Sequence, residues 1–432
     1  MKKMVISLLV LSVLGFALNA EQVTLKVLNY IDATQAGYAD DKAIWDAFAK
    51  ANPDIDLVKE ELFNEPFHQK TEAYIAAGQL PDVLFAWPSG RSASLHTKNL
   101  LKDLKPLLGS DLNNFVPAAV NPANQSGNKL AILPQSVTYT TAMYANVALL
   151  KANGLAVPKT YAELKAMVPK LKAKGIQTVL MANKDTWVMQ SCLFSTVSGR
   201  MAGNAFIDSV IKGNAKFTDK PFVDALTFIA TLYKDGVLSK DTIQTGYGEV
   251  PQLFADGKAA FLIDGDWRVG AFLTDKASGK ALIAPAAQKS DFEIISFPSI
   301  PGEKNPGLIS AIVGTGYGIS TNVAAGSAVE KAAVKLVQYL YSPAVQKVRL
   351  ETGAYIPSRK NVTSDKIEPL SGKLAAYYGK IPVTGYVLDG VIDGDNAPVV
   401  EVLNNGLQEI GIGTKTPAEV AAAMQAKVIA KK

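Results

Sequence analysis

The 432-residue chain is poor in the side chains that form disulfides and hold metals, with one cysteine, Cys192, and two histidines, His68 and His96. A single cysteine excludes an intrachain disulfide framework, and the scarcity of both residues excludes zinc fingers and Cys/His metal centres. A Ser-His-Asp mechanism would have to use one of only two histidines. The scarcity of cysteine and histidine argues against most classes of enzyme.

An excess of charge of one sign is also missing. The 44 Lys and Arg residues exceed the 39 Asp and Glu residues by 5, and there is no run of five like charges. We therefore expect no binding of nucleic acid. Apolar residues make up 48% and charged residues 19%, which excludes a disordered or collagen-like chain. At about 150 residues per domain, the length predicts more than one hydrophobic core.

Residues 1–20 have the layout of a secretory signal peptide. Lys2 and Lys3 precede an apolar run from Met4 to Leu18, and the polar Glu21 follows Ala20. This predicts cleavage after Ala20, with an uncleaved membrane anchor as the alternative. No later stretch reaches 18 apolar residues, and no cysteine stands at the cleavage point for a lipid anchor. We expect a soluble, exported protein of the periplasm.

Short apolar runs alternate with helical patterns along the rest of the chain. In residues 41–52, Ile44, Trp45 and Phe48 share one helix face, and residues 329–340 form a longer amphipathic helix. Strands separated by helices predict an α/β fold with parallel sheets and helices on both faces. The Pro/Gly-rich residues 298–307 are expected to form a linker or surface loop. The expected strands are residues 23–29, 55–58, 83–86, 130–133, 177–181, 259–263 and 294–297.

Aromatic and polar side chains follow several of these strands, where open α/β sheets bind their ligands. Trp87, Trp187 and Trp267 each lie past a strand end beside a polar or charged group, whereas Trp45 is expected in the core. Sugars offer C–H faces that stack on aromatic rings and hydroxyls that need donors and acceptors. The pattern therefore favours a sugar site. The candidate ligand-binding residues are Tyr30, Asp32, Trp87, Ser89, Arg91, Gln135, Tyr139, Trp187, Asp266, Trp267, Arg268, Gly314 and Tyr317.

Five stretches, residues 73–83, 129–144, 155–164, 254–267 and 314–320, carry a family resemblance by their order and spacing. With them the chain resembles the sugar-binding branch of the extracellular solute-binding proteins of ABC transporters, which includes maltodextrin-binding protein. The resemblance implies a monomeric receptor that captures a mono- or oligosaccharide and delivers it to permease subunits in the inner membrane. It implies neither enzymatic activity nor a cofactor.

The same resemblance implies a type II-like periplasmic binding protein fold, in which two α/β lobes close around the sugar. Crossovers near Gln135, Phe297 and Ile356 would divide the chain. Lobe 1 would hold residues 21–134 and 298–355, and lobe 2 would hold residues 135–297 and 356–432.

Position by position, the resemblance puts Tyr30 and Asp32 in the first sugar-contacting loop. It puts Trp87 and Ser89 in a second contacting loop of lobe 1, and Trp267 at the stacking position of lobe 2. The chain departs from the maltodextrin members at Trp87, because those members carry the aromatic one place earlier.

Two patterns in the chain resemble other ligand sites. Residues 314–318 are glycine-rich but lack the third glycine of the dinucleotide fingerprint, so a tight turn is expected there. Asp389, Asp393 and Asp395 suggest a calcium loop, but its twelfth position is Asn404 instead of Glu.

Two alternative functions also stay open. Tyr377-Tyr378 resembles the tyrosine pair of ferric-ion-binding proteins, although packing is the expected role. A secreted glycoside hydrolase needs two paired carboxylates, and no spacing in the sequence pairs any of the candidates. Those candidates are Asp32, Glu65, Asp264, Asp266 and Asp389.

Overall fold

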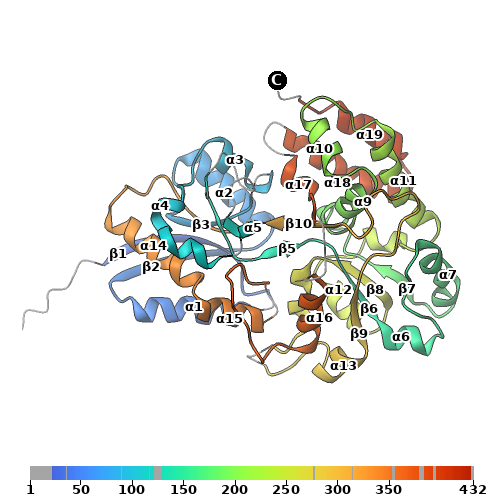
Figure 1. Ribbon diagram of the computed structural model, residues 1–432, viewed down its shortest axis with the longest axis horizontal. Helices are drawn as coiled ribbons and strands as arrows, with labels where there is room; N and C mark the ends of the chain where they lie inside the picture. The colour runs from blue at the N-terminus through green and yellow to red at the C-terminus, as the bar shows by residue number, and fades with distance from the viewer. Residues whose placement is uncertain are drawn as a thin grey trace, which may run out of the picture.

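The computed structural model describes residues 22–35, 37–88, 90–115, 117–120, 129–275, 278–313, 315–352, 356–378, 384–392 and 396–429. The expected signal peptide, Ser89, Gly314, Asp393 and Asp395 lie outside the described residues. The chain forms two lobes that lie side by side, with strands β5 and β10 between them (Figure 1). None of the helices in the described ranges is long and apolar enough to traverse a lipid bilayer.

The first lobe is built on a five-stranded sheet with the order β2-β1-β3-β11-β4. β1 runs parallel to β2 and β3, whereas β11 runs antiparallel to β3 and β4. The face of α1 that the sequence predicts, Ile44, Trp45 and Phe48, is buried in this lobe's core. The elements are β1 (Val23–Tyr30), α1 (Tyr38–Ala51), β2 (Ile55–Leu62), α2 (Glu65–Ala77), β3 (Val83–Ala86), η1 (Gly90–Ser92), α3 (Ala93–Thr97), α4 (Lys105–Leu108), η2 (Gly109–Asn114), α5 (Pro117–Val120), β4 (Leu133–Pro134), β11 (Gly316–Ile319), α14 (Ala328–Leu340) and α15 (Pro343–Glu351).

The second lobe has its own hydrophobic core around a four-stranded sheet with the order β7-β8-β6-β9. Thr160 and Glu163 form a capping box that begins α7. The elements are β6 (Ala142–Asn146), α6 (Val147–Ala152), α7 (Tyr161–Lys172), β7 (Gln177–Leu180), α8 (Trp187–Met189), the π-helical turn η5 (Gln190–Phe194), α9 (Ser195–Met201), α10 (Asn204–Ile211), α11 (Lys220–Lys234), η6 (Lys240–Ile243), α12 (Val250–Ala255), β8 (Ala259–Asp264), η7 (Asp266–Phe272), α13 (Pro285–Ser290), β9 (Phe292–Ile295), α16 (Pro369–Tyr378), α17 (Leu388–Val391), α18 (Ala397–Ile412) and α19 (Pro417–Gln425).

Both sheets are mixed, whereas the sequence pattern predicted parallel sheets. β6 runs antiparallel to both of its neighbours, β8 and β9. The expected strand 130–133 shortens to β4, because only Leu133 and Pro134 pair with β11. Alternating strands and helices therefore identified the class of the fold but not the direction of each strand.

A three-stranded sheet with the order β12-β10-β5 lies between the two cores. β5 (Val137–Tyr139) runs antiparallel to β10 (Ile309–Val313), and β12 (Thr384–Gly385) runs parallel to it. The chain leaves the first core after Leu133 and enters the second at Ala142, so β5 carries the first passage.

The second passage lies later than the expected crossover at Phe297. Phe297, Ile300 and Ile309 all pack in the second core, and Tyr317 is in the first core. The return therefore occurs at β10, and residues 298–308 belong to the second lobe instead of linking the lobes.

Hydrogen bonds from Arg200 hold residues 298–308 on the second lobe. The guanidinium of Arg200, which is 1% exposed, donates from Nη1 to the carbonyl of Phe297 at 2.9 Å and from Nε to that of Leu308 at 3.0 Å. Both ends of the Pro/Gly-rich loop are thereby fixed to α9. The third passage lies between Val348, which packs against the first core, and Ile356, which packs against the second.

Candidate ligand-binding site

Tyr30, at the end of β1, lies in the middle of an aromatic cluster on the first lobe. Its ring centroid is 4.7 Å from that of Trp87 in an edge-on arrangement and 5.5 Å from that of Phe85 in a stacked one. Phe63 and Phe67 complete the contacts, at 4.9 and 5.1 Å. We call these five residues the first-lobe aromatic cluster.

Trp87 is buried, so little of its ring is accessible to a ligand. It is 8% exposed and belongs to the first core. Its backbone N–H donates to Ser92 Oγ at 3.0 Å, and its carbonyl lies 2.7 Å from His96 Nε2. Tyr30 is half-buried at the margin of the cluster, so it is the better placed of the two for ligand contact.

His68 adds a polar group to this apolar environment. Its ring centroid lies 4.9 Å from that of Trp87, and Nε2 is buried without a hydrogen-bond partner among the described residues. Burial, reinforced by the charge of Arg91, lowers the pKa of His68 to about 4. The imidazole is therefore neutral at pH 7.

Asp32 lies in the loop after β1, as the sequence predicted, and is half-buried. Its Oδ1 accepts hydrogen bonds from the backbone N–H of Thr34 at 2.9 Å and from Thr34 Oγ1 at 2.5 Å. One carboxylate oxygen therefore shapes the loop itself.

The second lobe presents a group of three rings that we call the second-lobe aromatic cluster: Trp187, Tyr247 and Trp267. The centroid of Trp187 lies 5.2 Å from Tyr247 and 6.2 Å from Trp267. Trp267 Nε1 donates to Tyr247 Oη at 2.5 Å. Both tryptophans are half-buried, so each keeps part of its surface accessible. Sequence reasoning missed Tyr247, which follows no strand and matches no motif.

Gly265 allows Trp267 to take this position. A Cβ atom at residue 265 would clash with the six-membered part of the Trp267 indole, which lies directly over the glycine. The backbone of Gly265 is extended, with φ −77° and ψ 173°, so the ring and not the backbone requires glycine here.

An ion pair between Arg268 and Asp264 supports the second-lobe aromatic cluster. Arg268 Nε donates to Asp264 Oδ2 at 2.6 Å, and the guanidinium carbon lies 3.9 Å from the ring centroid of Tyr247. Arg268 is 6% exposed and Asp264 is 1% exposed. Arg268 therefore holds Tyr247 in place, and its ion-pair partner is Asp264 and not Asp266.

Asp266 is buried, and its Oδ2 accepts from the backbone N–H of Tyr139 at 2.8 Å. Burial raises the pKa of Asp266 to about 8, although the backbone N–H groups of Tyr139 and Trp267 oppose the shift. The side chain is thus largely protonated at pH 7. Tyr139 stacks on Tyr378 with centroids 4.0 Å apart and planes at 6°.

Arg91 links the first lobe to the second-lobe aromatic cluster. It comes from η1 on the first lobe, and its Nε donates to Asp389 Oδ2 of the second lobe at 3.0 Å. Its guanidinium carbon lies 5.1 Å from the centroid of Trp187. Because η1 packs against α17, this point is a direct contact between the lobes.

Gln135 and Tyr317 lie elsewhere, and both are 2% exposed. Gln135 Oε1 accepts from Arg349 Nη1 at 2.6 Å, and Arg349 Nη2 donates in turn to Asp41 at 3.2 Å. Tyr317 Oη donates to Asn29 Oδ1 at 2.5 Å inside the first core. Both side chains have partners in the interior, which argues against ligand contact for either.

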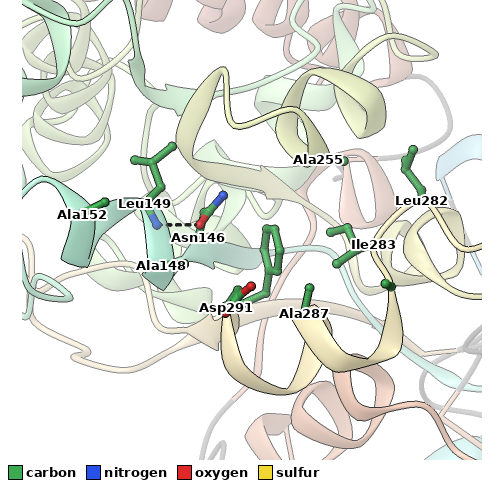
Figure 2. A pocket seen from close by; sticks show the side chains of 11 residues that line it. Asn146, Ala148, Leu149, Ala152, Ala255, Leu282, Ile283, Ala287 and Asp291 are labelled. Atoms are coloured by element: carbon green, nitrogen blue, oxygen red, sulfur yellow. Dashed lines mark hydrogen bonds between the residues drawn. The ribbon is translucent and has the colours of Figure 1, made fainter.

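Two surface depressions lie on the second lobe, and neither includes a residue of the aromatic clusters. One, with a volume of about 490 Å³, lies between α6, α12 and α13 (Figure 2). The other, of about 580 Å³, lies between α11 and the α18–α19 pair. Within the described ranges, no group of three or more His, Cys, Asp or Glu side chains is placed to hold a metal ion.

Comparison with known proteins identifies the family of the chain. The family model of bacterial extracellular solute-binding proteins matches residues 32–347. A galactooligosaccharide-binding protein of Bacillus subtilis is 27% identical over 74% of this chain and 71% of its own length. A multiple sugar-binding protein of Streptococcus mutans is 25% identical over 76% of this chain and 74% of its own.

The fold is shared with solved structures. One from a study of xylan utilization by Caldanaerobius polysaccharolyticus superposes with a TM-score of 0.82. The match covers 94% of this chain and all of the other chain, at 22% sequence identity.

Proposed function

The chain belongs to the bacterial extracellular solute-binding proteins, and from this premise we propose that it is a carbohydrate-binding receptor of an ABC importer. It captures a mono- or oligosaccharide by closing its two lobes and delivers it to membrane permease subunits. Its relatives are named as binding proteins for galactooligosaccharides and for multiple sugars, which supports carbohydrate as the class of ligand. We further propose that the protein is a monomer in the periplasm and that it needs no cofactor.

One observation carries the proposal: Arg91, from the lobe that holds the first-lobe aromatic cluster, contacts a ring of the second-lobe aromatic cluster. Arg91 contacts Trp187 and Asp389 of the opposite lobe, and its charge reaches Tyr30 and His68 of its own. Rings bind the C–H faces of a sugar, and the interleaved polar groups bind its hydroxyls. A site divided between two lobes suits a ligand that is enclosed when the lobes close.

The carboxylates argue for binding rather than glycoside hydrolysis. Asp264 is paired with Arg268, Asp389 with Arg91, and Asp266 accepts a backbone N–H. Hydrolysis needs two carboxyl groups that both face the scissile bond. The ferric-ion alternative also loses support, because Tyr378 Oη is buried and donates to the carbonyl of Thr141 at 3.1 Å.

Titration with a panel of mono- and oligosaccharides tests the proposal, with calorimetry and tryptophan fluorescence as readouts and chromatography of the mixture as a check for products. Saturable binding without new products is the expected result. Product release would favour the hydrolase. Binding of ferric ion with no response to any carbohydrate would favour the other alternative.

A further inference from the structure

Asp389 is a buried carboxylate with one oxygen paired and the other without a partner. The side chain is 7% exposed, and Oδ2 accepts from Arg91 Nε at 3.0 Å. Oδ1 is buried and meets no donor among the described residues. Leaving a carboxylate oxygen buried without a partner is unfavourable, so this atom calls for a donor beyond the residues that the structure describes.

A matching donor lies nearby. Trp187 Nε1 is also buried without a hydrogen-bond partner among the described residues. Because the Arg91 guanidinium contacts both Trp187 and Asp389, one cation brings together an unpartnered donor and an unpartnered acceptor. A hydroxyl group both donates and accepts, so this pair matches the rim of a sugar ring.

Both second-lobe groups are fixed to the same support. The backbone N–H of Leu388, next to Asp389, donates to Ser195 Oγ at 3.1 Å, and Ser195 Oγ donates to the carbonyl of Gln190 at 2.9 Å. Gln190 begins η5, the π-helical turn that directly follows α8 and Trp187. π-Helical turns occur frequently at functional sites. Asp389 and Trp187 are therefore held on one support of the second lobe, and Arg91 reaches both from the first lobe.

We propose that Asp389 is a ligand-binding residue: Oδ1 accepts a hydrogen bond from a hydroxyl of the carbohydrate while Arg91 of the opposite lobe holds Oδ2. The inference rests on the proposed function and deepens it. One carboxylate binds both the ligand and the other lobe, so recognition of that hydroxyl is coupled to closure. Trp187 Nε1 donates to the same hydroxyl or to its neighbour on the ring.

The test compares the wild type with Asp389→Asn and a matched control, Asp235→Asn. Asp235 is another ion-paired carboxylate of the second lobe, with a side chain 12% exposed, bonded to Lys165 at 3.0 Å and to Tyr161 Oη at 2.6 Å, outside both aromatic clusters. Affinity for the best carbohydrate of the panel is measured by calorimetry, after thermal unfolding has shown that each variant is folded. Asp389→Asn should weaken binding at least tenfold, and Asp235→Asn should change it less than twofold.

Deoxy analogues of that carbohydrate separate ligand contact from a structural role. The wild type should bind one analogue, the one lacking the contacted hydroxyl, at least tenfold more weakly, and Asp389→Asn should distinguish it from the parent sugar by a clearly smaller factor, because only the contact from Trp187 remains unaltered. Unchanged affinity of Asp389→Asn would overturn the inference. So would a weakened variant that discriminates all analogues as the wild type does. A wild type that binds no carbohydrate would overturn the proposed function, and this inference with it.

Discussion

Removal of the Trp267 indole should weaken carbohydrate binding without unfolding the protein. One face of the ring, roughly a third of the 150–250 Å² that an aromatic side chain buries, is about 60 Å². At about 25 cal/mol per Å², its burial contributes about 1.5 kcal/mol, and the ring geometry adds roughly 0.5–1.5 kcal/mol. Trp267→Ala should therefore raise Kd roughly 30- to 150-fold in calorimetry.

Two variants that keep the indole sharpen this test. Gly265→Ala puts a Cβ into the space of the Trp267 ring, so the ring must leave its place over residue 265. Gly248→Ala is the matched control, because a Cβ there meets no atom within 4 Å. We expect Gly265→Ala to weaken binding by less than Trp267→Ala, and Gly248→Ala to leave Kd unchanged. A folded Trp267→Ala protein with wild-type affinity would show that this ring does not stack on the ligand.

Three further predictions concern stability and shape. The pKa of Asp266 is raised from 3.8 to about 8 in the folded state, so the folded protein keeps a proton that the unfolded chain releases. The free energy of unfolding should therefore fall by up to about 1.4 kcal/mol per pH unit between about pH 4 and 8. Urea unfolding at several pH values measures this, and a flat profile would contradict it. Arg349→Ala leaves Asp41 and Gln135 without their buried partner, so urea unfolding should show a loss of about 3–5 kcal/mol, and a loss below 1 kcal/mol would contradict the role of this network. Solution scattering should give a smaller radius of gyration with saturating carbohydrate than without it, and an unchanged radius would argue for a rigid site.

The sequence predicted the α/β class, and it singled out several residues of the candidate site, because those features are local. The apolar spacing of Ile44, Trp45 and Phe48 directly reports one helix face. Trp187 and Trp267 were found because both follow a strand, and the end of a strand can be read from the sequence. The strand directions could not be read in this way, since the pairing of β6 with β8 and β9 is a long-range property.

The errors have the same origin. The Pro/Gly-rich residues after Phe297 were expected to form a linker or surface loop, and they do form a loop, but the family resemblance assigned them to the first lobe. The buried Arg200, nearly 100 positions earlier in the chain, and the packing of Ile300 in the second core tie that loop to the second lobe. Gln135 and Tyr317 lie within segments that carried the family resemblance, but their partners Arg349 and Asn29 hold their side chains in the interior.

The contact between Arg91 and Asp389 joins residues 298 positions apart, so no local pattern reports it. This contact bears directly on how binding and closure are linked. A ligand shifts the balance between open and closed lobes only by its difference in affinity for the two forms. A sugar that touched only the first-lobe aromatic cluster would bind both forms equally and leave the balance unchanged. A sugar that also bonds Asp389 gains that contact where Arg91 has already met the carboxylate, so it favours the closed form.

The measured affinity is then the intrinsic affinity of the closed site multiplied by the fraction of molecules that are closed. Arg91 contributes to this fraction even if it touches no atom of the ligand.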